Sequence, residues 1–140
     1  SGKTALITGA SKGIGKAIAV RFAQEGANVA FTYLSSVEKG QALEAELTAF
    51  GIKAKGYRSD ASDFKAAEEL VNGVVAEFGS LDILVNNAGN AHGLSAIQEG
   101  EVEDWQMMIG SNVNGLLYVS KMVLPGMVGL TFCGKRQKKK

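Results

Sequence analysis

A glycine-rich segment near the N-terminus carries the clearest chemical signal in the sequence. Residues 8–15 read Thr-Gly-Ala-Ser-Lys-Gly-Ile-Gly, between an apolar run and a segment with helical spacing. Glycines in such a turn let backbone N–H groups approach a phosphate, and the amino terminus of the next helix attracts negative charge. The segment predicts a site for a dinucleotide pyrophosphate. The alternative is a glycine-rich connection that serves packing alone.

A second polar segment, Asn86-Asn87-Ala88-Gly89, follows another apolar run. Ligands of open parallel sheets bind beyond the carboxyl ends of the strands. The two amides are suited to bonding backbone and a ribose there, and Gly89 leaves room for a ligand to pass. Taken alone, this segment is equally compatible with a simple turn.

Four β-rich runs must position these two segments. The predicted strands are 4–8, 28–33, 53–59 and 81–86. The segments between them are long enough for the crossover helices that parallel strands require. Gly26, Gly51 and Gly79 follow these helices, where a left-handed cap favours glycine. The alternation of strands and helices predicts an α/β fold.

The helical segments are predicted from apolar residues at three- and four-residue spacing. The first has Ile14, Ala17, Ile18 and Phe22 on one face. The second has Leu43, Leu47 and Phe50, after a capping box at Ser35 and Glu38. The third has Phe64, Ala67, Val71, Val74 and Phe78, with Ser62 and Asp63 as candidate caps.

A fourth helical stretch is predicted over residues 101–127. Its shared face is expected to contain Trp105, Met108, Ile109, Asn112, Leu116, Val119 and Val123. Gly110 and Gly115 weaken this helix and favour a break near Ser111. An amide on an apolar face needs partners, so Asn112 is either structurally bonded or functional.

Composition excludes several kinds of site. Single cysteine and histidine residues, Cys133 and His92, rule out an intrachain disulfide and a multi-histidine metal site, so no metal is expected. The net charge is +1, but five of the last six residues, 135–140, are Lys or Arg. This end is predicted to be a solvated tail, with nonspecific nucleic-acid binding as the alternative. The sequence has neither a bilayer-spanning apolar run nor a signal-peptide core, so a cytoplasmic location is expected.

Together, the motifs at 8–15 and 86–89 resemble the short-chain dehydrogenase/reductase family, over about residues 3–128. Residues 3–89 are most similar to its bacterial 3-oxoacyl-acyl-carrier-protein reductases, enzymes of fatty acid biosynthesis. Residues 89–128 are more similar to the branch that oxidises serine and 3-hydroxy acids. A divergent natural member and a recombined or engineered chain both fit this pattern.

The resemblance implies a Rossmann-type doubly wound parallel sheet with strand order 3-2-1-4, incomplete on its C-terminal side. It implies residues 1–128 as an NAD(P)-binding domain and 129–140 as a divergent basic tail. Asn112 matches the family's active-site asparagine, which helps to hold a proton-relay water. The implied cofactor-binding residues are Gly9, Ser11, Lys12, Gly13, Ile14, Gly15, Asp60, Ala61, Asn87, Ala88 and Gly89.

The expected cofactor is NADPH rather than NADH. NAD-specific sites have an acidic residue after the second strand that binds the ribose 2′-hydroxyl, but residues 32–36, Thr-Tyr-Leu-Ser-Ser, contain no carboxylate. Lys12 is suited to pairing with a 2′-phosphate, and family members that use NADPH often have a base there. The alternative for Lys12 is a solvated loop lysine.

The family's catalytic Ser and Tyr-x-x-x-Lys are expected after a fifth strand, beyond Val128. Tyr118 and Lys121 are one residue too close together and are interpreted as helix residues. The chain is therefore predicted to be a reductase by ancestry that is limited to cofactor binding. The alternatives are a non-catalytic α/β scaffold and a relative of the 3-hydroxy acid and serine dehydrogenases. An unpaired sheet edge is expected to favour homo-oligomers, while the full-length family binds small-molecule or acyl-thioester substrates.

Overall fold

The computed structural model describes residues 2–90, 93 and 95–129. Its four parallel strands are β1 (Thr4–Ile7), β2 (Asn28–Tyr33), β3 (Ala54–Arg58) and β4 (Ile83–Val85). They form one sheet in the order β3-β2-β1-β4. The predicted α/β class and strand order are therefore confirmed.

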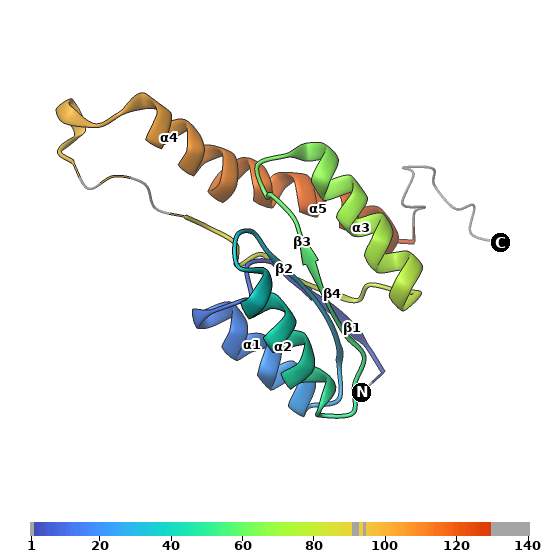
Figure 1. Ribbon diagram of the computed structural model, residues 1–140. Coiled ribbons are helices and arrows are strands. Elements are labelled where there is room, and N and C mark those ends of the chain that lie inside the picture. The colour runs from blue at the N-terminus through green and yellow to red at the C-terminus, as the bar shows by residue number, and fades with distance from the viewer. Residues whose placement is uncertain (1, 91–92, 94, 130–140) are drawn as a thin grey trace.

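Helices cover both faces of this sheet (Figure 1). The main ones are α1 (Gly13–Gln24), α2 (Val37–Thr48), α3 (Phe64–Phe78), α4 (Val102–Ile109) and α5 (Gly115–Met127). A short 3-10 turn, η1 (Ile97–Glu99), precedes α4, and a π-helical segment, η2 (Gly110–Asn114), joins α4 to α5. Among the residues described, no helix has the length and apolar character needed to cross a membrane.

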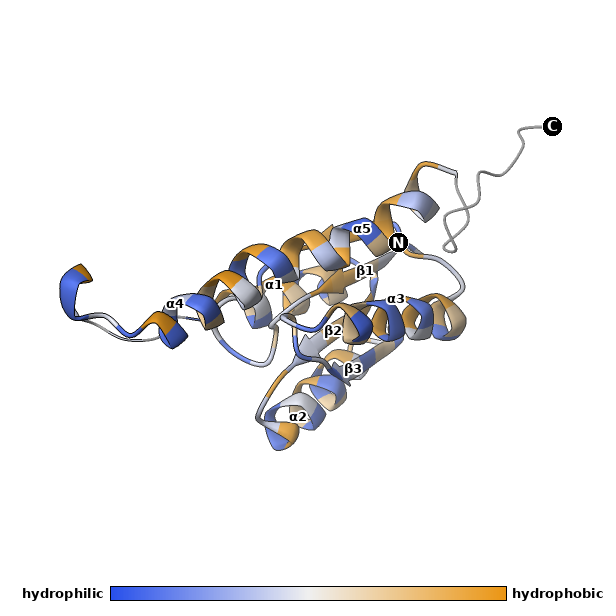
Figure 2. Ribbon diagram, turned by 90° about the horizontal axis from the view of Figure 1, so that it is seen from above, coloured by the Kyte–Doolittle hydropathy of each residue, from blue (hydrophilic) through white to orange (hydrophobic). Residues whose placement is uncertain are grey.

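The core consists of two layers, one on each face of the sheet. Leu6 and Ala30 pack with buried residues of α3 and α5, whereas Ile7 and Phe31 pack with those of α1 and α2. All of β1 is buried because it lies inside the sheet with helices on both faces. Apolar and polar segments alternate along the covering helices, as Figure 2 shows for α3 and α5.

The helix boundaries follow local capping chemistry. The hydroxyl of Ser36 accepts a hydrogen bond from the Lys39 backbone N–H at 3.3 Å, so the predicted cap at Ser35 is wrong by one residue. Asp63 Oδ1 accepts bonds from the N–H groups of Lys65 and Ala66 at 2.9 and 3.3 Å, which confirms Asp63 as the cap of α3. The three predicted glycine stops have positive φ values: Gly26 (85°), Gly51 (83°) and Gly79 (81°).

The buried face of α1 differs from the prediction. Ile14 is 75% exposed, and the buried residues are Gly15, Ala19 and Ala23. These small residues let α1 lie close to the sheet, while Phe22 packs only at the margin of the core. The prediction placed the large apolar residues of α1 on its buried face. The buried face instead consists of small residues, because only small side chains allow the helix to lie close to the sheet.

The predicted single apolar face over residues 101–127 is wrong for its first half and for Leu116, which is 43% exposed. Trp105 is 38% exposed and Ile109 is 52% exposed, whereas Val119 and Val123 are buried. The expected irregularity near Ser111 is the π-helical segment η2. A π-helical turn contains an extra residue, so it rotates the face of α5 relative to that of α4. As a result, α5 packs against α3 while α4 projects beyond the sheet (Figure 1).

Gly115 has a packing role at the start of α5. A Cβ atom there would lie 2.6 Å from the carbonyl oxygen of Ala61, so only glycine fits at this distance. A Cβ atom at Gly110 would lie 3.3 Å from Cβ of Ser62. Both glycines, predicted to weaken a helix, thus bring it against the turn after β3.

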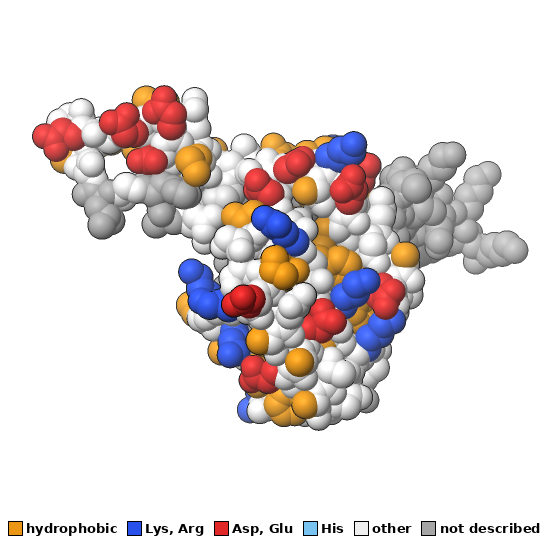
Figure 3. All heavy atoms as spheres, viewed as in Figure 1, with side chains coloured by type: hydrophobic (Ala, Val, Ile, Leu, Met, Phe, Trp, Pro, Cys, Tyr) orange, Lys and Arg blue, Asp and Glu red, His pale blue; other side chains and the backbone are white. Residues whose placement is uncertain are grey.

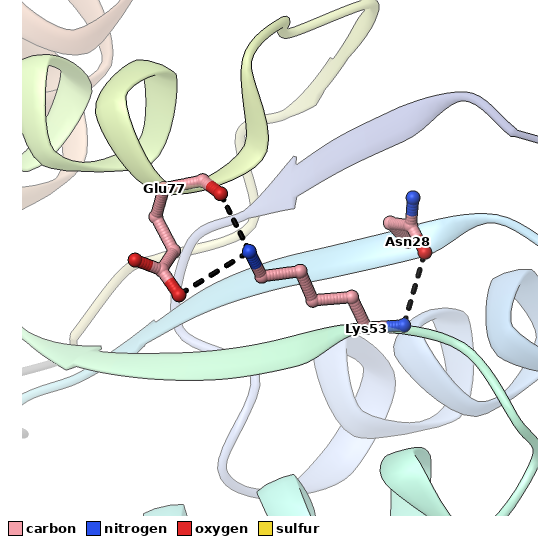
Figure 4. Close-up of polar contacts among 3 residues, drawn as sticks. All are labelled: Asn28, Lys53 and Glu77. Carbon is pink, nitrogen blue, oxygen red and sulfur yellow. Dashed lines mark hydrogen bonds and ion pairs between the residues drawn. The ribbon is translucent and has the colours of Figure 1, made fainter.

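The two edge strands of the sheet, β3 and β4, differ in the contacts that they make. At the β3 edge, Glu44 Oε2 of α2 accepts a bond from the Gly56 N–H at 2.8 Å. Lys53 Nζ donates to the Glu77 carbonyl oxygen at 2.6 Å and lies 3.3 Å from its carboxylate, while the Lys53 N–H donates to Asn28 Oδ1 at 3.0 Å (Figure 4). These contacts fasten β3 to both helical layers. At β4, the apolar residues 83–85 are only partly buried, and no described strand pairs with their outer edge.

Tyr57 of β3 has an unusual environment. Its ring packs at the margin of the α3–α5 core, and its hydroxyl is enclosed without a hydrogen-bond partner among the described residues. Burial, reinforced by the negative charges of Glu77 and Glu44, raises the pKa of Tyr57 from 10.0 to about 12. The folded state therefore favours the neutral phenol.

We expect Tyr57→Phe to change the alkaline stability of the domain. Because the folded pKa is raised, the contribution of Tyr57 to stability is present below pH 10 and is lost as the pH rises to about 12. The variant should lose less free energy of unfolding than the wild type in this window. Urea denaturation at several pH values measures the difference, with Tyr118→Phe as the control. Parallel profiles for Tyr57→Phe and the wild type would contradict this assignment.

Candidate functional site

A cavity of about 340 Å³ lies at the carboxyl ends of the four strands. It is lined by residues 9 and 11–14 after β1, 32–35 at the end of β2, 59–61 after β3, 87–90 after β4, and 111 of η2. The carboxyl edge of a parallel sheet is where this topology leaves room for a ligand.

The cavity brings together most of the predicted site residues. All of the predicted cofactor-binding residues except Gly15 line it, although they come from three separate loops. Asn112 does not line it either, but its neighbour Ser111 does. The structure also adds lining residues that the sequence did not single out as contacts, among them Ser59 and Asn90.

Gly15 lies behind the cavity, where α1 passes close to two strand ends. A Cβ atom at Gly15 would lie 2.6 Å from the Gly9 carbonyl oxygen and would also overlap Asn87 Nδ2. Gly9 has a φ of 68°, and a Cβ atom on it would lie 2.8 Å from Cα of Ala88. These glycines allow the turn after β1 to contact the segment after β4, which brings the amino terminus of α1 to the cavity.

The amino terminus of α1 is open toward this cavity. Lys12 occupies the cap position and makes no side-chain capping bond, whereas Ser36 caps α2 and Asp63 caps α3. Gly13 has a φ of 60°. Apart from its chain neighbours and the backbone of its own helix, no heavy atom of the described residues lies within 4 Å of the position of a Cβ atom on it. Because no acidic residue lies in the first turn, the free N–H groups and the helix dipole favour an anion there.

Two buried threonines hold the strand ends in place. Thr8 Oγ1 accepts bonds from the N–H groups of Asn87 and Ala88, each at 3.0 Å. Thr32 Oγ1 accepts a bond from the Gly9 N–H at 3.0 Å, and Asn87 Nδ2 donates to the Gly9 carbonyl oxygen at 2.9 Å. Neither threonine was predicted from the sequence to have a role. Their position at the ends of buried strands was the available signal, since a buried hydroxyl requires partners.

Asn112 is bonded to the segment that follows β4. Its Oδ1 accepts a bond from the Asn90 N–H at 2.7 Å, and its Nδ2 donates to the Asn90 carbonyl oxygen at 2.8 Å. Asn112 is exposed, so the prediction that it lies on a buried apolar face is wrong. Ser111 Oγ donates to the same Oδ1 at 3.0 Å. The side chain thus ties η2 to the rim of the cavity.

Tyr118 and Lys121 lie on α5, where they contact α3 rather than the cavity. The Tyr118 ring meets the Phe64 ring edge-on with centroids 5.4 Å apart, and Lys121 Nζ lies 5.6 Å from the centroid of Phe64. These contacts agree with their interpretation as helix residues.

The comparisons with known proteins agree with this geometry. The model of the short chain dehydrogenase family matches residues 3–137. The chain belongs to the short-chain dehydrogenase family. It is 36% identical over 126 residues to the 3-oxoacyl-acyl-carrier-protein reductase FabG of Staphylococcus aureus, covering 90% of this chain and 51% of that protein. It is 42% identical over 123 residues to the NADP-dependent 3-hydroxy acid dehydrogenase YdfG of Salmonella typhimurium, covering 88% and 48%.

Solved structures of short-chain dehydrogenases have the same fold. A Burkholderia cenocepacia enzyme in complex with NADP matches with a TM-score of 0.87 and 38% identity, over 91% of this chain and 51% of that one. NAD⁺-bound xylitol dehydrogenase matches with a TM-score of 0.87 and 34% identity, over 91% and 49%. This short-chain dehydrogenase chain therefore spans about half the length of the relatives it matches.

Charge is distributed unevenly around this short-chain dehydrogenase site. Acidic side chains gather over the projecting end of α4 (Figure 3). At the cavity, Asp60 Oδ1 accepts bonds from the N–H and hydroxyl of Ser62 at 2.9 and 2.7 Å.

Within the described residues, no three His, Cys, Asp or Glu side chains are grouped to hold a metal ion. His92, Cys133 and the basic segment 135–140 lie outside the residues described.

We expect Thr8→Val to loosen the site and lower the free energy of unfolding by about 1–3 kcal/mol, because two backbone N–H groups lose their acceptor. Urea denaturation measures the change. Thr48→Val is the matched control, since Thr48 is exposed on α2 and bonds only the Glu44 carbonyl oxygen. Equal effects of the two substitutions would contradict the role given to Thr8.

Proposed function

We propose that this chain binds NADP(H) in the cavity at the carboxyl ends of its strands. The observation that carries the proposal is the uncapped amino terminus of α1, which opens into a cavity lined by the predicted cofactor residues. Free N–H groups at a helix terminus suit the negative charge of a pyrophosphate. The open space beside Gly13 accommodates such a group.

Each part of the cofactor has a proposed set of residues. Gly9, Gly13 and Gly15 line the pyrophosphate, Gly15 by letting α1 approach. Lys12 pairs with the 2′-phosphate, and Ser11 and Ile14 also border the cofactor. Asp60 and Ala61 border the adenine. Residues 87–89 border the ribose of the nicotinamide.

The choice of NADPH over NADH rests on charge at the adenosine ribose. Residues 32–36 contain no carboxylate for a 2′-hydroxyl, and Lys12 lines the cavity nearby. The name of the Salmonella relative and the Burkholderia complex agree with NADP, whereas the xylitol dehydrogenase structure holds NAD⁺. The decision between the two cofactors therefore depends on the residues of this chain.

The proposed reaction of the complete enzyme is reduction of a 3-oxoacyl thioester, a step of fatty acid biosynthesis. When bound, the nicotinamide supplies the hydride. Asn112 is proposed to hold a proton-relay water, and its bonds to Asn90 support a fixed orientation beside the cavity. Oxidation of a 3-hydroxy acid is the second candidate, favoured by the 42% identity to YdfG.

These 140 residues are proposed to be limited to cofactor binding. The resemblance implies a Ser and a Tyr-x-x-x-Lys beyond residue 128, and Tyr118 and Lys121 are engaged with Phe64 instead. We propose residues 1–128 as the cofactor-binding domain and 129–140 as a divergent basic tail. A cytoplasmic location is proposed from the resemblance.

We expect saturating NADPH to raise the melting midpoint measured by circular dichroism. A ligand present at 100 times its Kd stabilises the folded state by about 2.7 kcal/mol, which corresponds to a shift of roughly 10 °C for a domain of this size. Lys12→Gln should weaken NADPH binding about tenfold, because it removes a charge-assisted contact, and leave NADH binding unchanged. Lys65→Gln, at an exposed position away from the cavity, is the control.

A cooperative melt that NADPH does not shift would contradict cofactor binding and favour a scaffold without a working site. The same preparation mixed with an acetoacetyl thioester should show no NADPH oxidation above the buffer rate. Steady oxidation would contradict the limit to cofactor binding.

We also propose that a second copy of the chain pairs with the outer edge of β4. The β3 edge is protected by Glu44 and by charged side chains, but residues 83–85 present an apolar edge without such protection. Unpaired strand edges favour association with another strand.

Light scattering should therefore detect dimers or larger species that dissociate on dilution. Ile83→Lys should shift the population toward monomer, because an edge lysine opposes pairing. Ile83 is partly buried and belongs to neither core cluster. Leu116→Lys, an exposed apolar position on α5, is the control. A monomer at high concentration, or an equal effect of both variants, would contradict pairing through β4.

A further inference from the structure

Arg58 lies where the ends of β2 and β3 meet. It is the last residue of β3 and is paired with Tyr33, the last residue of β2. The Ser59 N–H donates to the Tyr33 carbonyl oxygen at 3.0 Å, and Arg58 Nε donates to the Leu34 carbonyl oxygen at 3.1 Å. Leu34 itself lines the cavity. The guanidinium is thus attached to the loop that borders the adenosine end of the proposed cofactor site.

This attachment uses one of the five guanidinium donors. In the described part of the chain, no carboxylate lies within ion-pair distance of Arg58, whereas Arg21 pairs with Glu25 at 2.8 Å. The bond from Nε restricts the orientation of the group and leaves both terminal nitrogens for another acceptor. Arg58 is therefore a cation without an anionic partner among the described residues, bonded to the loop that lines the cavity.

The chemistry expected beside Leu34 matches this cation. In a dinucleotide site, the adenosine ribose lies beyond the end of the second strand, and its 2′ substituent distinguishes the two nicotinamide cofactors. A guanidinium binds phosphate through parallel N–H donors, which a hydroxyl does not satisfy. Lys12, in the turn after β1, also lines this cavity.

We propose that Arg58 is a specificity-determining residue that binds the 2′-phosphate of NADPH from the β3 side, in addition to Lys12. This inference rests on the proposed function, because it assumes that adenosine lies beside Leu34. It adds Arg58 of β3 to the residues that distinguish NADPH from NADH, which otherwise lie in the glycine-rich turn and at the end of β2.

The test compares two pairs of probes that differ in one phosphate. Calorimetric titration of the full chain with NADPH and NADH, and with 2′,5′-ADP and 5′-AMP, separates 2′-phosphate recognition from recognition of the shared nucleotide. We expect Arg58→Gln to weaken NADPH and 2′,5′-ADP binding about tenfold, because one charge-assisted phosphate contact is lost. NADH and 5′-AMP binding should change less than about twofold. Arg58→Lys, which keeps the charge without the paired donors, should lie between the wild type and Arg58→Gln.

Arg21→Gln is the matched control for removing one arginine, and its exposed ion pair lies on α1. If Arg58→Gln lowers the affinity for all four probes equally, Arg58 only holds the loop. If the affinity for NADPH is unchanged, Arg58 does not contact the cofactor. Either result overturns the inference. If the wild type binds NADPH but the Arg58 variants do not show the expected difference between the probes, the proposed function stands and only the inference about Arg58 is overturned. A wild type that binds none of the probes overturns both.

Discussion

The close contact between the turn after β1 and the segment after β4 is the constraint on which the rest of the site depends. Gly9 and Gly15 leave no room for a side chain between these backbones. The side chains of Thr8 and Asn87 then join the two segments by hydrogen bonds of 2.9–3.0 Å to backbone groups. This contact fixes where α1 begins. Its uncapped amino terminus consequently faces the cavity, and an anion-binding position exists before any ligand arrives.

The same contact explains why the cavity combines residues from distant parts of the sequence. Parallel strands present all their carboxyl ends at one edge, so each loop needs only to leave its strand in the right direction. The turn after β3 is pressed against η2 and α5 through Gly115, and Asn112 ties η2 to Asn90. The cavity is therefore bordered on several sides by backbone held in place by side-chain bonds. Such a frame is suited to a ligand recognised by shape and charge.

The two sheet edges indicate which side of the domain is self-contained. On the β3 side, Glu44 accepts a hydrogen bond from the outward-facing N–H of Gly56. Lys53, which directly precedes β3, donates to the Glu77 carbonyl oxygen of α3. On the β4 side, three apolar residues remain only partly buried. A buried parallel sheet is normally covered on both faces and bordered by further strands. The half-length match to the relatives agrees with this asymmetry.

Local sequence patterns by themselves determined the strands, the glycine stops and the family motifs, because glycine conformations and apolar runs act within a few residues. The resemblance that these motifs carry then gave ten of the seventeen residues that line the cavity. Tertiary structure alone decided which helix faces are buried. The close approach of α1 selects Ala19 and Ala23 over Ile14. The π-helical segment η2 gives α4 and α5 different faces, so Ile109 is exposed while Val119 and Val123 are buried. Tertiary structure alone also gave Thr8, Asn90 and Arg58 their partners, because hydrogen bonds between residues far apart in the chain depend on how the loops meet in space, which the spacing of residues along the chain does not encode.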